Sequence, residues 1–174
     1  MDTWVALLRG VNVGTANRLA MADLRALLTD LGYADVRTLL NSGNAVFTAP
    51  EPPDPDALSA TLAQRLGVRS PVVLLRVGEL AAAVGEDPLG RAGEDDSRLL
   101  LVFCAEPPDP KRFVAEVAGG DLAVGARWLH IWCPDGVLAS PHAPLTADKG
   151  AGTTVTSRNR RTAERLLALA GEPG

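Results

Sequence analysis

Residues 3–77 switch between two hydrophobic periods, and the order of these periods restricts the fold more than any other feature. Short apolar runs are typical of β-strands, and apolar residues three or four positions apart are typical of helices. The order is strand, helix, strand, strand, helix, strand, which is the βαββαβ order of ferredoxin-like folds. Strands are expected at 3–8, 36–40, 45–48 and 71–77, and helices from Met21 to Leu31 and from Pro55 to Leu66.

A similar pattern begins again at residue 99. It predicts strands at 99–104, 121–124, 127–133 and 153–156, a helix opened by Asp109-Pro110, a short helix near Leu145, and a last helix over Ser157–Ala170. The strands Val72–Leu75 and Leu99–Phe103 are apolar on both faces, as in strands covered on both sides. The sequence therefore predicts an α+β protein with two ferredoxin-like (βαββαβ) subdomains packed together and an extra C-terminal helix.

Residues 85–98 (GEDPLGRAGEDDSR) separate the two patterns. They have no apolar periodicity and are rich in Gly, Asp and Glu, which is typical of a linker or exposed loop. The predicted division is an N-terminal subdomain at 1–84, a linker at 85–98 and a C-terminal subdomain at 99–174. A solvated acidic loop is a better interpretation of Asp95-Asp96 than a metal site or an acid/base pair.

The composition restricts the partners. The chain has 174 residues, is 47% hydrophobic and carries a formal charge of −4, so no nucleic-acid footprint is visible in the total, although its distribution could hide one. No apolar run approaches the roughly 20 residues that span a bilayer, and no signal peptide is recognisable, so we expect a cytoplasmic protein without a membrane partner. Cys104 and Cys133 each end an apolar run, and no His/Cys cluster has metal-ligand spacing, so neither a cofactor nor a metal is expected. The oligomeric state is left open.

The polar loop after the first strand is the main candidate site. Arg9-Gly10-Val11-Asn12-Val13-Gly14 follows an apolar run, and about a dozen residues pass before Met21, whereas most connections have about 4–6 residues. The loop matches neither GxGxxG nor GxxxxGK[S/T]. Glycines would let backbone N–H groups face a guest, and Arg9 or Arg18 could pair with an anion. The alternative is that Gly10, Asn12, Gly14 and Asn17 only satisfy unusual backbone angles.

The start of the predicted last helix is the second candidate. Four arginines (158, 160, 161 and 165) in its first turns would oppose the helix dipole, unless an anion or carboxylates neutralise them. The alternative is an ordinary arginine-rich surface with Glu164 nearby. A third feature, the alternation Trp128-His130-Trp132, places three rings on one strand face. Packing in a core or between the two halves is favoured over base stacking, because no RNA-binding motif accompanies the rings.

Several of these motifs together resemble the bacterial family called domain of unknown function 1697. They are the loop Leu8–Gly14, the helix start at Met21 and Leu24, the turn Ser42-Gly43-Asn44, and Thr156-Ser157-Arg158-Asn159. The resemblance implies two ferredoxin-like subdomains and implies no activity. Thr15 and Arg160 depart from the family pattern, which tends to have Gly and an aromatic residue there.

The leading hypothesis is a binding module for a small anionic ligand, phosphate-like or nucleotide-like. In it, the opening loop and the start of the last helix form one pocket. An enzyme acting on a phosphorylated or nucleotide-like substrate with the same pocket is one alternative, although no nucleophile stands out. A structural or interaction protein without a small-molecule site is another. The predicted ligand-binding residues are Arg9, Gly10, Asn12, Gly14, Asn17, Ser42, Asn44, Arg158 and Asn159.

Overall fold

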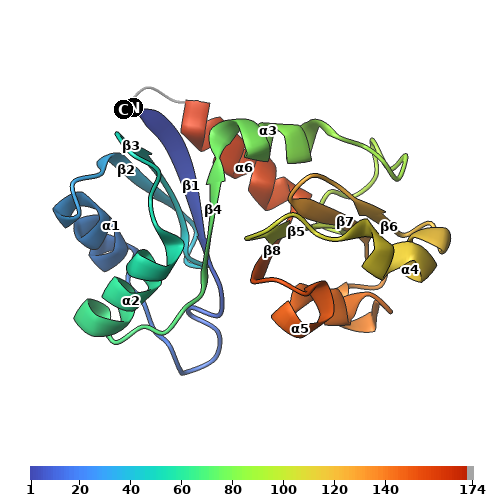
Figure 1. The fold of residues 1–174 in the computed structure, drawn as a ribbon, viewed down its shortest axis with the longest axis horizontal. Helices are drawn as coiled ribbons and strands as arrows, with labels where there is room; N and C mark the ends of the chain where they lie inside the picture. Colours follow the sequence, from blue (N-terminus) through green and yellow to red (C-terminus); the bar gives the residue numbers. More distant parts are fainter. Residues whose placement is uncertain (172–174) are drawn as a thin grey trace. The chain divides into compact units, whose positions relative to one another are not determined.

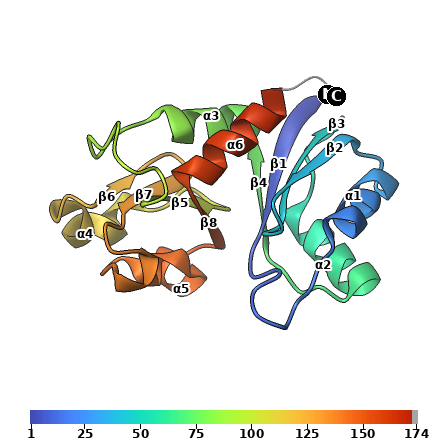
Figure 2. The ribbon, with the colours of Figure 1, turned by 180° about the vertical axis from the view of Figure 1, so that it is seen from behind.

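Residues 1–171, described in a computed structural model (backbone only for residue 115), form helices and strands that divide into two compact units. One unit comprises Met1–Leu80 with the chain from Arg165 onward, and the other comprises Ala81–Glu164. Figure 1 and the reverse view in Figure 2 label the α-helices and strands among the elements of the two units. In chain order these are β1 (Asp2–Leu8), α1 (Met21–Asp30), β2 (Ala34–Leu39), β3 (Asn44–Ala49), α2 (Pro55–Leu66), β4 (Val72–Arg76), α3 (Val77–Gly85), β5 (Leu99–Cys104), the 3₁₀ turn η1 (Pro110–Phe113), α4 (Val114–Ala118), β6 (Leu122–Val124), β7 (Trp128–Trp132), the 3₁₀ turns η2 (Val137–Ala139) and η3 (Ala143–Thr146), α5 (Asp148–Ala151), β8 (Val155–Asn159) and α6 (Arg160–Gly171).

The first unit contains a four-stranded sheet with the order β2-β3-β1-β4. All neighbouring strands are antiparallel, and Val5 of β1 lies opposite Val46 of β3 on one side and Leu75 of β4 on the other. The order strand, helix, strand, strand, helix, strand that the sequence predicts is therefore observed. Because β1 is antiparallel to both neighbours, it ends where β3 and β4 begin. The loop after β1 therefore meets the segments that lead into both of those strands.

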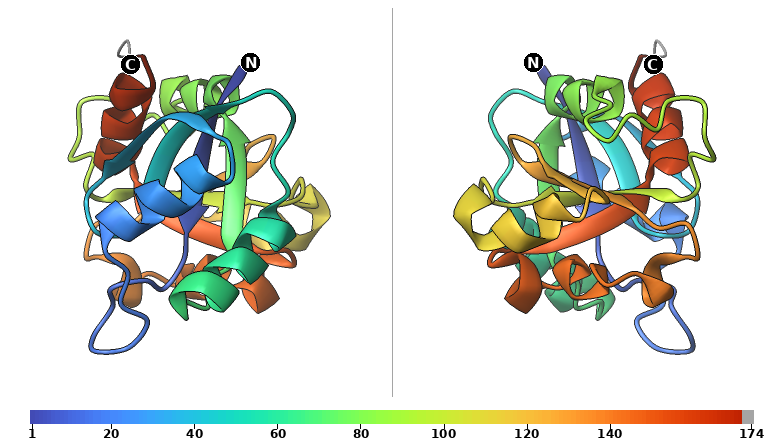
Figure 3. Two further views of the ribbon diagram at one scale, coloured as in Figure 1. Left: turned by 90° about the vertical axis from the view of Figure 1, so that its left-hand side faces the viewer. Right: turned by 90° about the vertical axis from the view of Figure 1, so that its right-hand side faces the viewer.

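Helices α1 and α2 cover one face of this sheet, as Figures 1 and 3 show. Each helix has leucines at helical spacing, and these side chains are removed from water against the sheet. The buried cluster includes Leu24, Leu27 and Leu28 of α1, Leu58 and Leu62 of α2, and Trp4, Ala6, Leu8, Ala45, Phe47, Val72 and Leu74 of the strands.

Helix α2 begins and ends where its sequence predicts. Asp54 accepts hydrogen bonds from the backbone N–H groups of Asp56 (2.9 Å) and Ala57 (3.2 Å), and Pro55 occupies the first turn. Gly67 ends the helix in the left-handed conformation (φ 67°) and donates its N–H to Ala63 O. These local signals satisfy backbone groups that a helix end leaves without partners.

The second unit contains another four-stranded antiparallel sheet, with the order β6-β7-β5-β8. Its core packs the apolar side chains of β5 and β7 against Phe113 of η1 and against the segment between β7 and β8. The buried residues include Leu100, Val102, Cys104, Phe113, Leu129, Ile131, Cys133, Leu145, Ala151 and Val155. The mixed α+β class with two antiparallel sheets is thus confirmed. Two compact units are observed, while the predicted boundaries at 85–98 stay a prediction.

Several element predictions for the second half need correction. Helix α3 was not predicted, because it follows β4 without a loop and has only 9 residues. Asp109 caps a 3₁₀ turn, accepting from Lys111 N at 3.0 Å, and α4 has only 5 residues. Residues 137–152 form η2, η3 and α5 in place of one short helix. The last strand extends to Asn159, so α6 begins at Arg160 and not at Ser157.

Candidate functional site

The loop between β1 and α1 is tied to the first sheet at its base. The N–H of Leu8 donates to Gly43 O in the turn before β3 (2.8 Å), and the N–H of Arg9 donates to Pro71 O, just before β4 (3.2 Å). Further along, the two sides of the loop are joined by a hydrogen bond, in which the N–H of Asn12 donates to Asn17 O at 3.1 Å. Its tip extends away from the sheet, as the blue segment in Figure 3 shows.

Asn12 fixes one flank of the loop. Its side-chain Oδ1 accepts from Leu19 N (2.9 Å), while Nδ2 donates to Leu19 O (2.8 Å) and to Asn41 O (2.7 Å). Its backbone is in the left-handed region (φ 56°), where Asn is tolerated better than bulkier residues. One amide thus connects the loop to the start of α1 and to the turn before β3.

Asn17 fixes the opposite flank in a similar way. Its Oδ1 accepts from Arg69 N (3.0 Å), and its Nδ2 donates to Arg69 O (2.9 Å) and Gly10 O (3.0 Å). It too has a left-handed backbone (φ 55°). Both carboxamides are therefore used to shape the loop, so the backbone interpretation explains these two residues well. A direct contact of Asn12 or Asn17 with a ligand stays a prediction.

Ser70 completes the base of the loop and was missed by sequence reasoning. The side chain is buried, and its Oγ accepts from Arg9 N (3.0 Å) and lies 2.8 Å from Arg9 O, to which its hydroxyl can donate. A serine directly before an apolar strand gives little signal in a sequence, since its partner is 61 residues away.

The turn before β3 packs directly under the loop. Gly43 has φ 79°, and a Cβ there would lie 2.6 Å from Leu8 Cβ and 2.8 Å from Val11 Cγ2, so only glycine fits. Asn44 is fully buried and donates from Nδ2 to Leu39 O and Ser42 Oγ, both at 2.9 Å. Leu40 also has a left-handed backbone (φ 57°), which is unusual for a bulky residue.

Three arginines belong to this end of the first unit. The segments 9–20, 40–44 and 67–71, which the contacts above bring together, contain Arg9, Arg18 and Arg69 and no Asp or Glu. Arg18 and Arg69 are exposed, and neither forms an ion pair in the part of the chain that the structure describes. These three segments carry a net positive charge, although the whole chain has a formal charge of −4, and their nearest acidic neighbours are Asp23 in the first turn of α1 and Asp56, which lines a pocket together with Arg69.

A pocket of about 470 Å³ lies beside the loop. It is lined by Asn12, Arg18, Leu19, Ala20 and Asn41, and so joins the loop, the start of α1 and the turn before β3. Ala20 precedes α1 and provides no side-chain cap for the helix. Small-molecule sites have about 300–1,000 Å³, so this pocket has the volume of one. From sequence, Arg18 is expected only as a possible partner for an anion, and Asn41 is not expected in a site.

The remaining predicted residues, Arg158 and Asn159, belong to the second unit. Both lie in β8, where Arg158 pairs in register with Leu101 and Asn159 with Leu100 of β5. Arg158 Nη1 donates to Thr156 Oγ1 (3.0 Å) and Ser157 O (2.7 Å), and burial lowers the pKa of its guanidinium to about 10. The structure thus gathers the other seven predicted residues in the first unit and places these two in the second.

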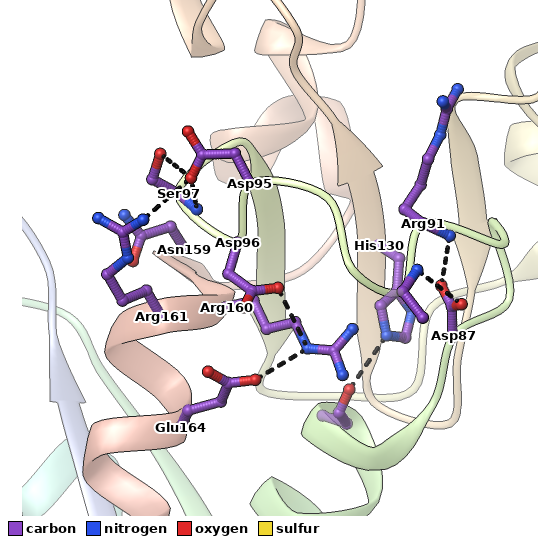
Figure 4. Close-up of polar contacts among 12 residues, drawn as sticks. Asp87, Arg91, Asp95, Asp96, Ser97, His130, Asn159, Arg160, Arg161 and Glu164 are labelled. Atoms are coloured by element: carbon purple, nitrogen blue, oxygen red, sulfur yellow. Dashed lines mark hydrogen bonds and ion pairs between the residues drawn. The ribbon is translucent and has the colours of Figure 1, made fainter.

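Carboxylates neutralise the arginines at the start of α6. Figure 4 shows Arg160 between Asp96 and Glu164, with Nε at 3.8 Å and 3.2 Å from their oxygens, and Arg161 bonded to Asp95 at 3.0 Å. Asn159 caps the helix by accepting from Thr162 N (2.9 Å). The apparent conflict with the helix dipole is therefore resolved for three of the four arginines, since Arg158 precedes the helix and Arg160 and Arg161 have acidic partners.

The Trp128-His130-Trp132 face is buried, which confirms that these rings pack inside the protein. Trp128 Nε1 donates to Glu86 Oε2 (2.9 Å), and His130 Nε2 lies 3.1 Å from Ala83 O, so this nitrogen must hold the proton. Burial lowers the pKa of His130, and its Nδ1 has no hydrogen-bond partner among the described residues. A neutral, packed histidine is the consistent assignment.

Metal binding, thiol reactivity and membrane insertion can each be assessed for residues 1–171. Within that range no group of three His, Cys, Asp or Glu side chains could hold a metal ion. Burial raises the pKa of Cys104 to about 11 and also raises the pKa of Cys133, so neither thiol is activated. No helix in the described chain has the length and apolar character needed to span a membrane.

Comparison with known proteins places these features in a family. No curated protein matches the chain. The structure of "conserved bacterial protein SP0830 from Streptococcus pneumoniae" has a similar fold, with a TM-score of 0.65 and 23% sequence identity over 97% of this chain and 98% of that one. The sequence profile of the family "Protein of unknown function (DUF1697)" matches residues 1–120. The match includes the segments 9–20, 40–44 and 67–71 but not residues 156–159. The chain therefore belongs to the DUF1697 family.

Proposed function

We propose that the protein binds a small anionic ligand at the cationic end of its first unit. One observation supports this proposal most strongly. Three chain segments that meet through hydrogen bonds contain no carboxylate and supply Arg9, Arg18 and Arg69. Arginine binds phosphate and carboxylate groups through its planar fork of N–H donors. The pocket lined by Arg18 and Asn41 supplies a concave surface for such a group.

The shape of the loop supports the proposal. Asn12 and Asn17 hold both flanks of the loop with six hydrogen bonds between them, so its base is preorganised. Preorganisation lowers the entropic cost of binding. Left-handed backbone at Asn12, Asn17 and Leu40 is also concentrated at this end, and such strained positions are common at ligand sites.

Inorganic phosphate is the simplest probe of the site. We expect phosphate to raise the melting temperature of the wild-type chain, since a ligand at about 100 times its Kd stabilises by about 2.7 kcal/mol. Arg18→Ala and Arg69→Ala should weaken this effect. Arg65→Ala is the matched control, because Arg65 is an exposed arginine of the same unit that already pairs with Asp30 at 2.6 Å. Equal phosphate effects in all three variants would exclude the site.

A larger site that also includes Arg158 and Asn159 stays a prediction. Arg158→Ala tests it, because a phosphate effect that survives this substitution but not Arg18→Ala would confine the site to the first unit. We further propose that both units are ferredoxin-like, a proposal supported by their antiparallel strand orders β2-β3-β1-β4 and β6-β7-β5-β8. A cytoplasmic location likewise stays a prediction.

A further inference from the structure

We infer that the ligand is a phosphate monoester of a hydroxylated aliphatic compound, such as a sugar phosphate, and not a nucleotide. This inference rests on the proposed function and narrows the ligand class of the same site. Two features of the pocket support it. Only certain polar side chains are available to a ligand, and the surrounding segments lack aromatic side chains.

Two of the five lining side chains can offer polar groups to a ligand. Asn12 uses both halves of its carboxamide within the protein, and Leu19 and Ala20 have no polar side-chain atoms. Arg18 and Asn41 are exposed, and their side chains form no hydrogen bond or ion pair in the described part of the chain. Among the side chains that line the pocket, one cation and one neutral amide are therefore available to a ligand.

Each of these groups selects a different part of a ligand. The Arg18 guanidinium matches a phosphate group, which accepts two parallel N–H bonds. The Asn41 carboxamide both donates and accepts, so it matches a hydroxyl, which does the same. The backbone of Asn41 is anchored, because its carbonyl accepts from Asn12 Nδ2 at 2.7 Å. A phosphorylated alcohol or sugar carries both partners.

A nucleotide lacks its usual partners here. Nucleobases are commonly recognised by stacking on aromatic side chains. The segments 9–20, 40–44 and 67–71 contain no Phe, Tyr or Trp. The side chains Val13 and Leu40, which are 72% and 47% exposed, are aliphatic. The surroundings of the pocket thus offer charge, one amide and aliphatic surface, which suit a compact non-aromatic ligand.

The test compares four probes by calorimetric titration of the full chain: inorganic phosphate, glucose 6-phosphate, adenosine monophosphate and glucose. We expect glucose 6-phosphate to bind most tightly and glucose not to bind. Asn41→Ala should weaken the binding of glucose 6-phosphate about 3–10-fold, the value of one hydrogen bond, and weaken the binding of inorganic phosphate less. Arg18→Ala should weaken the binding of inorganic phosphate, glucose 6-phosphate and adenosine monophosphate. Circular dichroism of each variant controls for folding.

The outcomes separate the two proposals. If phosphate binds in an Arg18-dependent way but adenosine monophosphate binds as tightly as glucose 6-phosphate, the ligand class is wrong and the anion site stands. The ligand class is also wrong if Asn41→Ala weakens both inorganic phosphate and glucose 6-phosphate equally, or neither. If no phosphate compound binds, the proposed function is wrong and the inference is overturned with it.

Discussion

The carboxamide of Asn17 pairs with the backbone of Arg69 in both directions, accepting from its N–H at 3.0 Å and donating to its carbonyl at 2.9 Å. In this pairing a side chain replaces a neighbouring strand, because it satisfies the same two groups that a sheet partner would satisfy. It connects the loop after β1 to the segment before β4, and so brings Arg18 and Arg69 to one end of the unit.

Asn17→Ala should therefore destabilise the first unit. The substitution removes three hydrogen bonds and leaves the backbone of Arg69 without this partner, at an expected cost of about 1–3 kcal/mol. Urea denaturation followed by circular dichroism measures it. Thr15→Ala, at the exposed loop tip, is the control and should change stability by less than about 0.5 kcal/mol. Equal small effects of both variants would contradict the role given to Asn17.

Gly43→Ala should be more costly than an ordinary glycine substitution. The added Cβ would meet Leu8 Cβ at 2.6 Å as well as require an alanine at φ 79°, so we expect a loss of about 2–4 kcal/mol. Gly67→Ala measures the cost of a positive φ alone, because Gly67 has φ 67° and open space around its Cβ position. This substitution should lower the free energy of unfolding by about 1 kcal/mol. The same denaturation experiment compares them, and a similar loss in both would show that the turn does not pack tightly on β1.

Stability should decrease as the pH falls below the ordinary pKa of histidine. Burial lowers the pKa of His130 in the folded chain, so the unfolded chain takes up a proton first, below about pH 6.5. The loss is at most about 1.4 kcal/mol per pH unit for one proton. Unfolding free energies at about pH 7.5 and about pH 5.5 should differ less in His130→Phe than in the wild type. An unchanged difference would assign the pH effect to other groups, the nearby Glu86, Asp87 and Arg160 included.

Arg160 and Arg161 should differ in their contribution to stability. The Arg160 side chain is 16% exposed and lies between two carboxylates, whereas that of Arg161 is 63% exposed. Exposed ion pairs contribute about 0–1 kcal/mol, and breaking a more buried pair costs more. Arg160→Met should thus destabilise more than Arg161→Met in thermal denaturation. The reverse order would show that the contacts of Arg160 are not stabilising.

The parts of the fold that the sequence predicts well depend on local signals. Asp54, Pro55 and Gly67 mark the ends of α2 because capping acts within a few residues of a helix end. The loop after β1 is recognisable for the same reason, since its length and its glycines and asparagines are visible in the sequence. Its candidate site is therefore located from sequence in outline.

The errors come from contacts between distant residues. The boundary between β8 and α6 is set by the pairing of Arg158 and Asn159 with β5, which overrides the helical pattern of the segment. Ser70 is recognisable only once its contact with Arg9 is known. Arg18 and Asn41 likewise form one pocket wall only after the chain folds, so periodicity and spacing could not indicate them as a pair.

Anion binding at the cationic end of the first unit can be measured most directly by titrating the isotope-labelled protein with inorganic phosphate and following its amide NMR signals. We predict saturable shifts concentrated in residues 9–20, 40–44 and 67–71, which Arg18→Ala reduces and Arg65→Ala preserves. Phosphate shifts that are absent, do not saturate, or concentrate elsewhere in the chain would contradict anion binding at this site.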